Sequence, residues 1–205
     1  MTAGGGLFAT FEGGERTGKS TQIEALAARL RSADHTVVTS REPGGTELGE
    51  RLRETLFAGE SPAPQAELLI FAAARAQLVQ ELIRPALDRG EVVLCDRFAD
   101  STVAYQQFGR GLNAALVASV NAAATGGLIP DLTVLLDMPP NEARQRGDEE
   151  TDYIEREEAV FHERVREGYL ALASAEPDRW ATLDARLPIE ELTDLIWKRI
   201  APLLP

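Results

Sequence analysis

Five short apolar runs divide the chain, and each is long enough for one buried β-strand. They span residues 7–11, 36–40, 92–95, 132–137 and 180–183. Between them lie stretches with apolar residues at helical spacing, as at Ile23, Leu26 and Leu30. Strands that alternate with helices of this length need crossover connections. The pattern therefore predicts an α/β protein with a mainly parallel sheet and helices on both of its faces.

The predicted helices account for most of the remaining sequence. The first ends near Leu30, a short one carries Arg144 and Arg146, and the others span about 47–57, 65–88, 101–107, 113–125, 155–173 and 189–203. Pro85 is a possible kink in the longest of them. The segment of about residues 147–155 is predicted to form a short mobile lid. Its first part is polar and acidic and has no apolar periodicity. Neither a repeat nor a second domain is evident, so residues 1–205 are predicted to form a single domain.

The first strand leads directly into a glycine-containing loop. Its sequence, Gly13-Gly14-Glu15-Arg16-Thr17-Gly18-Lys19-Ser20, has the G-x-x-x-x-G-K-S pattern of a phosphate-binding P-loop. Glycines allow the positive φ angles with which successive N–H groups point at one anion. Lys19 is expected to reach the β- and γ-phosphates, Ser20 to bind Mg²⁺, and the helix N-terminus at Thr21 to face the same phosphates. The pattern predicts the three-layer P-loop NTPase fold, with residues 13–21 binding ATP.

Composition and charge exclude several other classes. The 205-residue chain has a net charge of −12, which argues against nucleic acid as a partner. No run of 18 apolar residues and no signal-peptide pattern are evident, so we expect no membrane partner and a cytoplasmic location. The single cysteine, Cys95, lies in an apolar strand and is expected to be buried and inert.

Polar residues at strand ends indicate further chemistry, because ligands bind beyond the carboxyl ends of parallel strands. Asp96 is predicted to hold Mg²⁺ together with Ser20, and Arg97 to clamp a second phosphate group. His35 and His162 are expected to be solvated rather than catalytic. No general base is evident, and a phosphate monoester, unlike a hydroxyl, is already anionic. This favours a nucleoside monophosphate as the phosphoryl acceptor.

Several further stretches, each weak alone, have a specific order and spacing. They are Phe11-Glu12-Gly13, residues 41–46 (Arg-Glu-Pro-Gly-Gly-Thr), 71–75, Asp96-Arg97-Phe98 with Ser101-Thr102 and Tyr105-Gln106, residues 109–112, 130–133 and Leu136-Asp137. In these stretches the chain resembles the thymidylate kinase family over almost its whole length. The resemblance implies a phosphotransferase that transfers the γ-phosphate of ATP to dTMP with Mg²⁺, in dTTP synthesis, and that forms a homodimer.

The resemblance also implies how the acceptor is bound. Phe71 stacks on the thymine ring, Arg75 hydrogen-bonds its edge, and Thr102 and Gln106 face the base. Tyr105 crowds the position of a ribose 2′-hydroxyl and so selects deoxyribose by steric exclusion.

Three further roles follow from the same resemblance. Glu15 receives the sugar 3′-hydroxyl, Arg97 bridges the donor and acceptor phosphates, and either Arg144 or Arg146 flanks the adenine.

The chain also departs from the family pattern. Ala74 and Leu78 replace a common aspartate and histidine, which leaves details of the base pocket open. Most bacterial relatives carry a small residue at position 16 and an arginine in the lid, where this chain has Tyr153. We therefore expect Arg16 to supply the cation beside the transferring phosphoryl group, although Arg144, Arg146 or Arg156 could do so. The predicted catalytic residues are Lys19, Arg16, Arg97 and Asp96.

Alternative functions remain open at this point. A deoxynucleoside kinase would need a general base, for which Glu12 or Glu42 could serve, and another nucleoside-monophosphate kinase would share the P-loop. A regulatory P-loop GTPase is disfavoured because the chain has no Asn-Lys-x-Asp guanine-binding motif.

Overall fold

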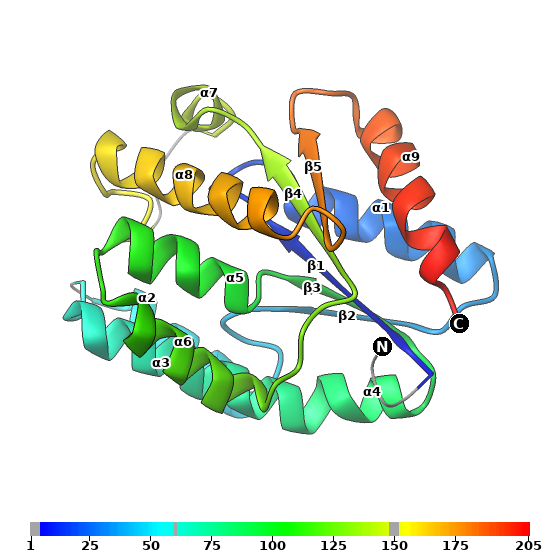
Figure 1. The fold of residues 1–205 in the computed structure, drawn as a ribbon, viewed down its shortest axis with the longest axis horizontal. Coiled ribbons are helices and arrows are strands. Elements are labelled where there is room, and N and C mark those ends of the chain that lie inside the picture. The colour runs from blue at the N-terminus through cyan, green and yellow to red at the C-terminus, as the bar shows by residue number, and fades with distance from the viewer. Residues whose placement is uncertain (1–4, 60, 148–151) are drawn as a thin grey trace.

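A five-stranded parallel sheet runs through the centre of the computed structural model, which describes residues 5–59, 61–147 and 152–205 (Figure 1). The strands are β1 (Leu7–Glu12), β2 (Val37–Arg41), β3 (Val92–Asp96), β4 (Leu132–Asp137) and β5 (Trp180–Asp184). Their order is β2-β3-β1-β4-β5, and every neighbouring pair is parallel. The predicted parallel α/β fold is confirmed.

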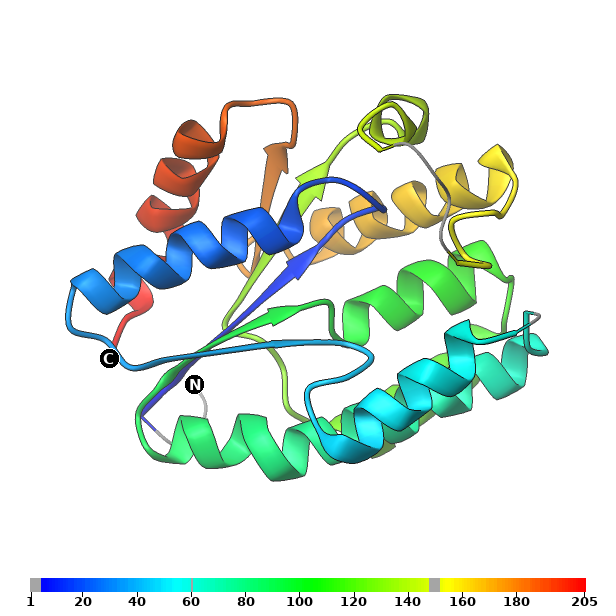
Figure 2. The same ribbon diagram turned by 180° about the vertical axis from the view of Figure 1, so that it is seen from behind.

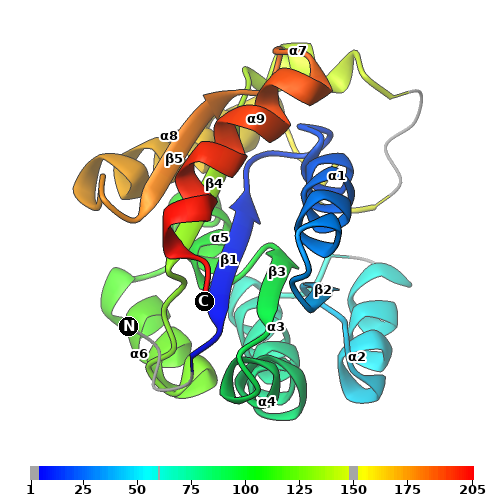
Figure 3. The same cartoon turned by 90° about the vertical axis from the view of Figure 1, so that its right-hand side faces the viewer.

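The two faces of β1 bury different residues, because successive side chains in a strand point to opposite faces. Leu7, Ala9 and Phe11 pack against α1 (Lys19–Ser32) and α9 (Ile189–Ile200). Figure 3 shows these two helices on one side of the sheet. Phe8 and Glu12 alternate with these residues along the strand and therefore point to the opposite face of the sheet, which a second layer of helices covers.

That second layer is built from several helical segments (Figure 3). They are α3 (Pro64–Leu78), π-helical η1 (Val79–Ile83), α4 (Arg84–Asp88), α5 (Ala99–Thr102), π-helical η2 (Val103–Gly109), α6 (Ala114–Thr125) and α8 (Ala159–Ala175). Outside it lie α2 (Glu47–Phe57), α7 (Pro140–Arg144) and the 3₁₀ turn η3 (Ala201–Leu203). Figure 2, seen from behind, shows the blue loop between β1 and α1 at the same end of the molecule as the yellow segment before α8.

Several predicted helix boundaries need correction. The long helix at 65–88 loses its regular hydrogen bonding at η1, just before Pro85, because proline has no N–H to donate to the preceding turn. The helix predicted from 101 to 107 is likewise π-helical from Val103. The helix expected from residue 155 begins at Ala159, and Arg146 lies beyond the end of α7. Of the predicted lid, residues 148–151 lie outside the described residues, Asp152 is a bend, and residues 153–155 belong to a turn.

The structure also bears on the burial of Cys95 and on whether any helix could span a membrane. Cys95 is fully buried in β3, as predicted, and burial raises the pKa of its thiol. Among the described residues, no helix is both long and apolar enough to span a bilayer.

Candidate active site

The P-loop leaves β1 through a tight turn that requires glycine. Gly13 has φ +139°, and a Cβ atom built there would lie 2.5 Å from the Leu136 carbonyl oxygen. Gly18 also has a positive φ, as does Arg16 at +59°. The ammonium group of Lys19 is buried and donates hydrogen bonds to the Gly14 and Gly13 carbonyl oxygens, at 2.8 and 3.3 Å. The loop thus has the curvature and the cation of a phosphate-binding site.

A pair of oxygen ligands lies beside this loop. The Ser20 hydroxyl donates a hydrogen bond of 2.8 Å to Oδ2 of Asp96, the last residue of β3. Mg²⁺ prefers such hard oxygen donors and commonly takes only one or two from the protein, the rest coming from water and phosphates. The described residues contain no cluster of three or more His, Cys, Asp or Glu side chains able to hold a metal. Ser20 and Asp96 thus offer two oxygen donors of the kind that Mg²⁺ prefers.

Arg97 lies at the junction between the P-loop and a second pocket. Its Nη2 forms an ion pair of 2.7 Å with Glu15, and Nη1 donates to the Gly13 carbonyl oxygen at 2.9 Å. Tyr105 donates its hydroxyl proton to the same Glu15 oxygen at 2.7 Å. Burial alone would raise the pKa of Glu15, but the positive charges of Arg97 and Lys19 outweigh it and lower the pKa to about 2. Glu15 is thus held as an anion between two cations.

The second pocket brings together all seven residues predicted to bind the acceptor. It is lined by Glu15, Phe71, Arg75, Arg97, Thr102, Tyr105 and Gln106, with Glu42, Pro43, Arg53, Phe57, Ser101, Asp152 and Ile154. These residues come from the P-loop, α2, α3, η2, the segments that follow β2 and β3, and the turns before α8. The π-helical geometry of η2 carries Tyr105 and Gln106 into this pocket, in agreement with the frequent occurrence of π-bulges at functional sites.

Arg75 is more constrained than the sequence suggested. Only 1% of it is exposed, and its five N–H groups point at protein oxygens. Two contact Glu42 Oε2 at 2.7 and 2.8 Å, and the others contact Thr102, Asn121 and the Phe98 carbonyl oxygen at 2.8 to 3.0 Å. A hydrogen bond to the edge of a base, as predicted for Arg75, would have to replace one of these contacts.

Sequence reasoning missed Arg53 as a lining residue of this pocket. Arg53 is partly buried, donates to the Pro43 carbonyl oxygen at 3.0 Å, and lies over the Phe57 ring at 5.0 Å. Helical spacing in the sequence could have indicated this position. Arg53 is four residues after the buried Gly49 and so lies on the inward face of α2. It adds a third guanidinium, after those of Arg75 and Arg97, to a pocket predicted to bind a phosphate.

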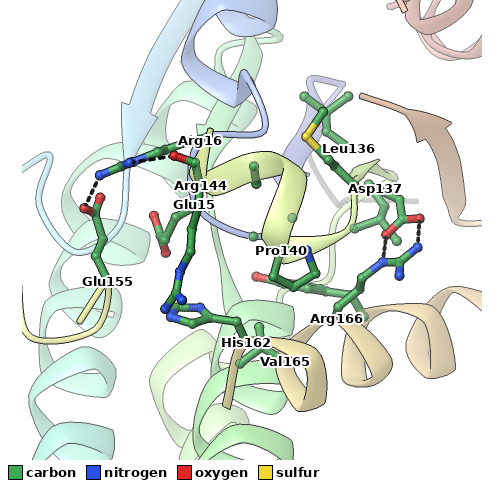
Figure 4. Close-up of a pocket in the computed structure, with 16 residues that line it drawn as sticks. Glu15, Arg16, Leu136, Asp137, Pro140, Arg144, Glu155, His162, Val165 and Arg166 are labelled. Carbon is green, nitrogen blue, oxygen red and sulfur yellow. Dashed lines mark hydrogen bonds and ion pairs between the residues drawn. The ribbon is translucent and has the colours of Figure 1, made fainter. Parts of the chain in front are cut away.

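A further pocket lies on the other side of the P-loop, between β4, α7 and α8 (Figure 4). Arg16 reaches across its mouth: Nη2 pairs with Glu155 at 3.0 Å, and Nη1 donates to the carbonyl oxygen of Gly147 at 3.0 Å. Arg144 also lines this pocket. Arg146 does not, because its guanidinium donates to the Ala185 carbonyl oxygen at the end of β5. The two arginines proposed to flank adenine therefore lie in different places.

The prediction for His162 needs correction. The sequence suggested a solvated side chain, but His162 is partly buried, lines the pocket of Figure 4, and has no hydrogen-bond partner for Nε2 among the described residues. Burial and then the charge of Arg144 lower its pKa.

Tyr153, at the position where the family pattern has an arginine, is 6% exposed, and its ring centroid lies 5.9 Å from that of Phe57. It therefore belongs to a hydrophobic cluster.

The fold, the P-loop, the Ser20–Asp96 pair and the adjoining arginine-lined pocket together define a P-loop nucleotide phosphotransferase. A family model described as thymidylate kinase matches residues 11–196 of this chain. The chain therefore belongs to the thymidylate kinase family, and the prediction of a phosphotransferase of this family is confirmed. This membership also sets aside the regulatory GTPase hypothesis.

Individual relatives agree over nearly the full length. The chain is 51% identical over 204 residues to a thymidylate kinase of Deinococcus radiodurans, with 96% of this chain and 97% of that protein covered. A thymidylate kinase of Thermomicrobium roseum is 50% identical over 200 residues, with 96% and 95% covered. The crystal structure of thymidylate kinase from Ehrlichia chaffeensis is similar with a TM-score of 0.80 at 32% identity, covering 94% of this chain and 97% of that one.

Proposed function

We propose that this chain transfers the γ-phosphoryl group of ATP to the 5′-phosphate of dTMP, giving dTDP and ADP. The observation that carries the proposal is the position of Arg97. Its guanidinium contacts both Gly13 and Glu15 in the P-loop, and it also lines the pocket that contains the predicted base-binding residues. A single cation between donor and acceptor can stabilise the charge that develops on both phosphates.

The reaction needs alignment and positive charge more than proton transfer. The acceptor phosphate is already anionic, so phosphoryl transfer requires no carboxylate to act as a base. Lys19, Arg97 and Arg16 would supply charge around the donor phosphates. Ser20 and Asp96 would hold Mg²⁺, which neutralises phosphate charge when bound.

Selectivity for deoxythymidine monophosphate would come from the second pocket. Phe71 would stack on the base, while Thr102 and Gln106 would contact its edge. Tyr105 is fixed by its hydrogen bond to Glu15, and the same bond orients Glu15 for a sugar hydroxyl. A ring held at one end cannot readily move aside for a 2′-hydroxyl, so the pocket favours deoxyribose.

Glu42 is the residue that favours a deoxynucleoside kinase as a second candidate function. It lines the acceptor pocket, and its Oε1 is buried without a hydrogen-bond partner among the described residues. Burial raises its pKa despite the ion pair with Arg75. A carboxylate at this position would accept a proton from the 5′-hydroxyl of a bound nucleoside.

A coupled ADP-release assay with dTMP, thymidine, dUMP and UMP as acceptors tests both functions. We expect Mg²⁺-dependent turnover with dTMP and none with thymidine. Turnover of thymidine comparable to that of dTMP would contradict the assignment of a monophosphate acceptor. Homodimer formation and a cytoplasmic location remain predictions, and light scattering of the purified chain tests the first of them.

A further inference from the structure

Glu12, the last residue of β1, is a buried carboxylate with a defined set of donors. It has no exposed surface. The Phe98 N–H donates to Oε1 at 2.8 Å, while the hydroxyls of Ser101 and Tyr169 donate to Oε2 at 2.5 and 2.9 Å. Glu12 does not line the acceptor pocket, so a substrate hydroxyl has no direct access to the carboxylate.

The same two hydroxyls also contact Arg97. Its Nη1 donates to the Tyr169 oxygen at 3.0 Å and to the Ser101 oxygen at 3.4 Å, and the two hydroxyl oxygens lie 2.8 Å apart. Each hydroxyl has one proton. When both protons point to an anionic Glu12, both hydroxyl oxygens can present lone pairs to Arg97.

We propose that Glu12 is a positioning residue for phosphoryl transfer: its carboxylate orients Ser101 and Tyr169 so that their oxygens hold Arg97 between the P-loop and the acceptor pocket. The proposal rests on the function proposed above for Arg97. It assigns Glu12 a different role from the general base considered in the sequence analysis, because Glu12 acts on a cation through two hydroxyls and does not meet the substrate.

Packing alone does not account for a carboxylate at this position. Burying an ion is costly unless partners compensate for the lost solvation. Glu12 has no direct ion pair among the described residues; its three donors are neutral. The positive charge of Arg97 lies one hydroxyl away, so the energetic benefit of the anion is coupled to the position of Arg97.

The charges around Glu12 make its ionisation sensitive to pH near neutrality. Burial, followed by repulsion from Asp100, raises the pKa of Glu12 to about 7, although Ser101, Arg97 and the Phe98 N–H oppose that shift. The titratable or charged groups that face it are Asp100 on α5, Arg97 after β3, Tyr169 on α8, Lys19 on α1 and Cys95 on β3. Asp100 is itself paired with Arg179 at 2.7 Å. A protonated Glu12 would donate to one hydroxyl and turn that hydroxyl's proton towards Arg97.

Glu12→Gln is the sharpest test, because glutamine keeps the shape but not the charge. Its amide oxygen can still accept from Phe98, but its NH₂ group would then donate to Ser101 and Tyr169. Their protons would turn towards Arg97, which has no acceptor to offer. We expect kcat at about pH 8 to fall by about 10- to 100-fold, the scale of losing one hydrogen bond to a charged group. The KM for dTMP should change little.

The pH profile separates a positioning role from a purely structural one. The phosphates of both substrates also titrate, but they do so equally for wild type and variant, so the ratio of the two kcat values cancels them. With a pKa of about 7 for Glu12, the ratio of wild-type kcat to Glu12→Gln kcat should fall by about 5- to 10-fold between about pH 8 and about pH 6. Thr10→Val is the matched control, since Thr10 is equally buried on β1 but pairs with Thr133 away from Arg97. Its kcat ratio to wild type should be independent of pH.

Three outcomes would decide against the inference. An unchanged kcat in Glu12→Gln, or a reduced kcat whose ratio does not vary with pH, would overturn it. If circular dichroism shows that Glu12→Gln does not fold, Tyr169→Phe decides instead. That variant removes one of the two hydroxyls and should lower kcat several-fold with unchanged dTMP KM; wild-type kcat would overturn the inference. A wild-type chain without dTMP-dependent ADP release would instead contradict the proposed function.

Discussion

Replacing Arg16 by glycine gives a stringent test of how this kinase stabilises the transferring phosphoryl group. The guanidinium of Arg16 extends from the P-loop to Glu155, and also donates to the carbonyl oxygens of Gly147 and Arg144 at 3.0 and 3.4 Å. Tyr153 stands at the position where the family pattern has an arginine. It is packed in a hydrophobic cluster and carries no positive charge. Arg16→Gly removes the cation and leaves the length of the P-loop unchanged.

The substitution should have little net effect on folding. Arg16 has a φ of +59°, a conformation that costs a non-glycine residue about 1 kcal/mol or more and that glycine adopts freely. Against this gain stands the ion pair with Glu155, whose side chains are 18% and 15% exposed and whose contribution is about 1 kcal/mol. The two effects have opposite signs. The free energy of unfolding should therefore stay within about 1 kcal/mol of wild type.

The catalytic effect should be much larger. Arginines that stabilise phosphoryl transfer contribute about 10³-fold or more to kcat, which corresponds to about 4 kcal/mol. Arg16 lines the pocket of Figure 4 and does not line the acceptor pocket. We therefore expect kcat to fall by about 10³-fold and the KM for dTMP to stay nearly constant. Arg16→Lys should recover only part of kcat, because an ammonium group cannot make two parallel contacts.

The assay is coupled ADP release at saturating ATP and variable dTMP, with chemical denaturation to verify stability. Arg89→Ala is the matched control: it also removes one guanidinium from an ion pair, but Arg89 lies on an exposed turn before β3, at the opposite end of the sheet. Its kcat should equal that of wild type. A kcat for Arg16→Gly within a few-fold of wild type would refute the reasoning, and Arg144 would become the next candidate for the cation.

Three further variants test other parts of the site. Lys19→Ala should lose about 3 kcal/mol or more of transition-state stabilisation with its circular dichroism unchanged, and near-normal turnover would remove Lys19 from the phosphate site. Tyr105→Ala should relax discrimination against ribonucleoside monophosphates by about 10-fold, measured as the ratio of kcat/KM for dUMP and UMP; a constant ratio would place the exclusion elsewhere. Because the pKa of Glu12 is raised to about 7 in the folded state, its contribution to stability is complete below the unfolded pKa and is lost as the pH rises through 7. Urea denaturation should show the stability of wild type relative to Glu12→Gln falling by about 2 kcal/mol between about pH 5.5 and about pH 8, and a constant difference would contradict the raised pKa.

Local patterns carried most of the information about the fold. The apolar runs predicted β1, β3 and β4 well because these central strands are buried and need continuous apolar sequence. The order of strands and helices then left few topologies possible. The seven residues predicted to bind the acceptor line one pocket, and their roles in binding remain predictions. That result came from the family resemblance. The Phe71 side chain alone would have been assigned to a hydrophobic core.

The errors concern contacts that no local pattern encodes. The start of α8 was placed too early because Glu155 to Glu158 has no residue that forbids a helix. Contacts from distant residues, among them Arg16, Arg110 and Arg144, hold this segment outside the helix. His162 looked solvated because its helix is rich in charge, yet its side chain lines a pocket. Glu12 was considered as a base because of its place in the sequence. Its three donors come from residues 86, 89 and 157 positions away.

The position of Arg97 is determined from β1 by two independent routes. Its backbone N–H donates to the Phe11 carbonyl oxygen at 2.9 Å, which extends the pairing of β1 with β3 by one residue. Its side chain donates to the Gly13 carbonyl oxygen directly and reaches Glu12 through two hydroxyls. Three consecutive residues, Phe11 to Gly13, thus hold both the backbone and the guanidinium, and the same strand continues into the P-loop. One strand end therefore orients both the P-loop and the guanidinium that lies between it and the pocket lined by Phe71 and Tyr105.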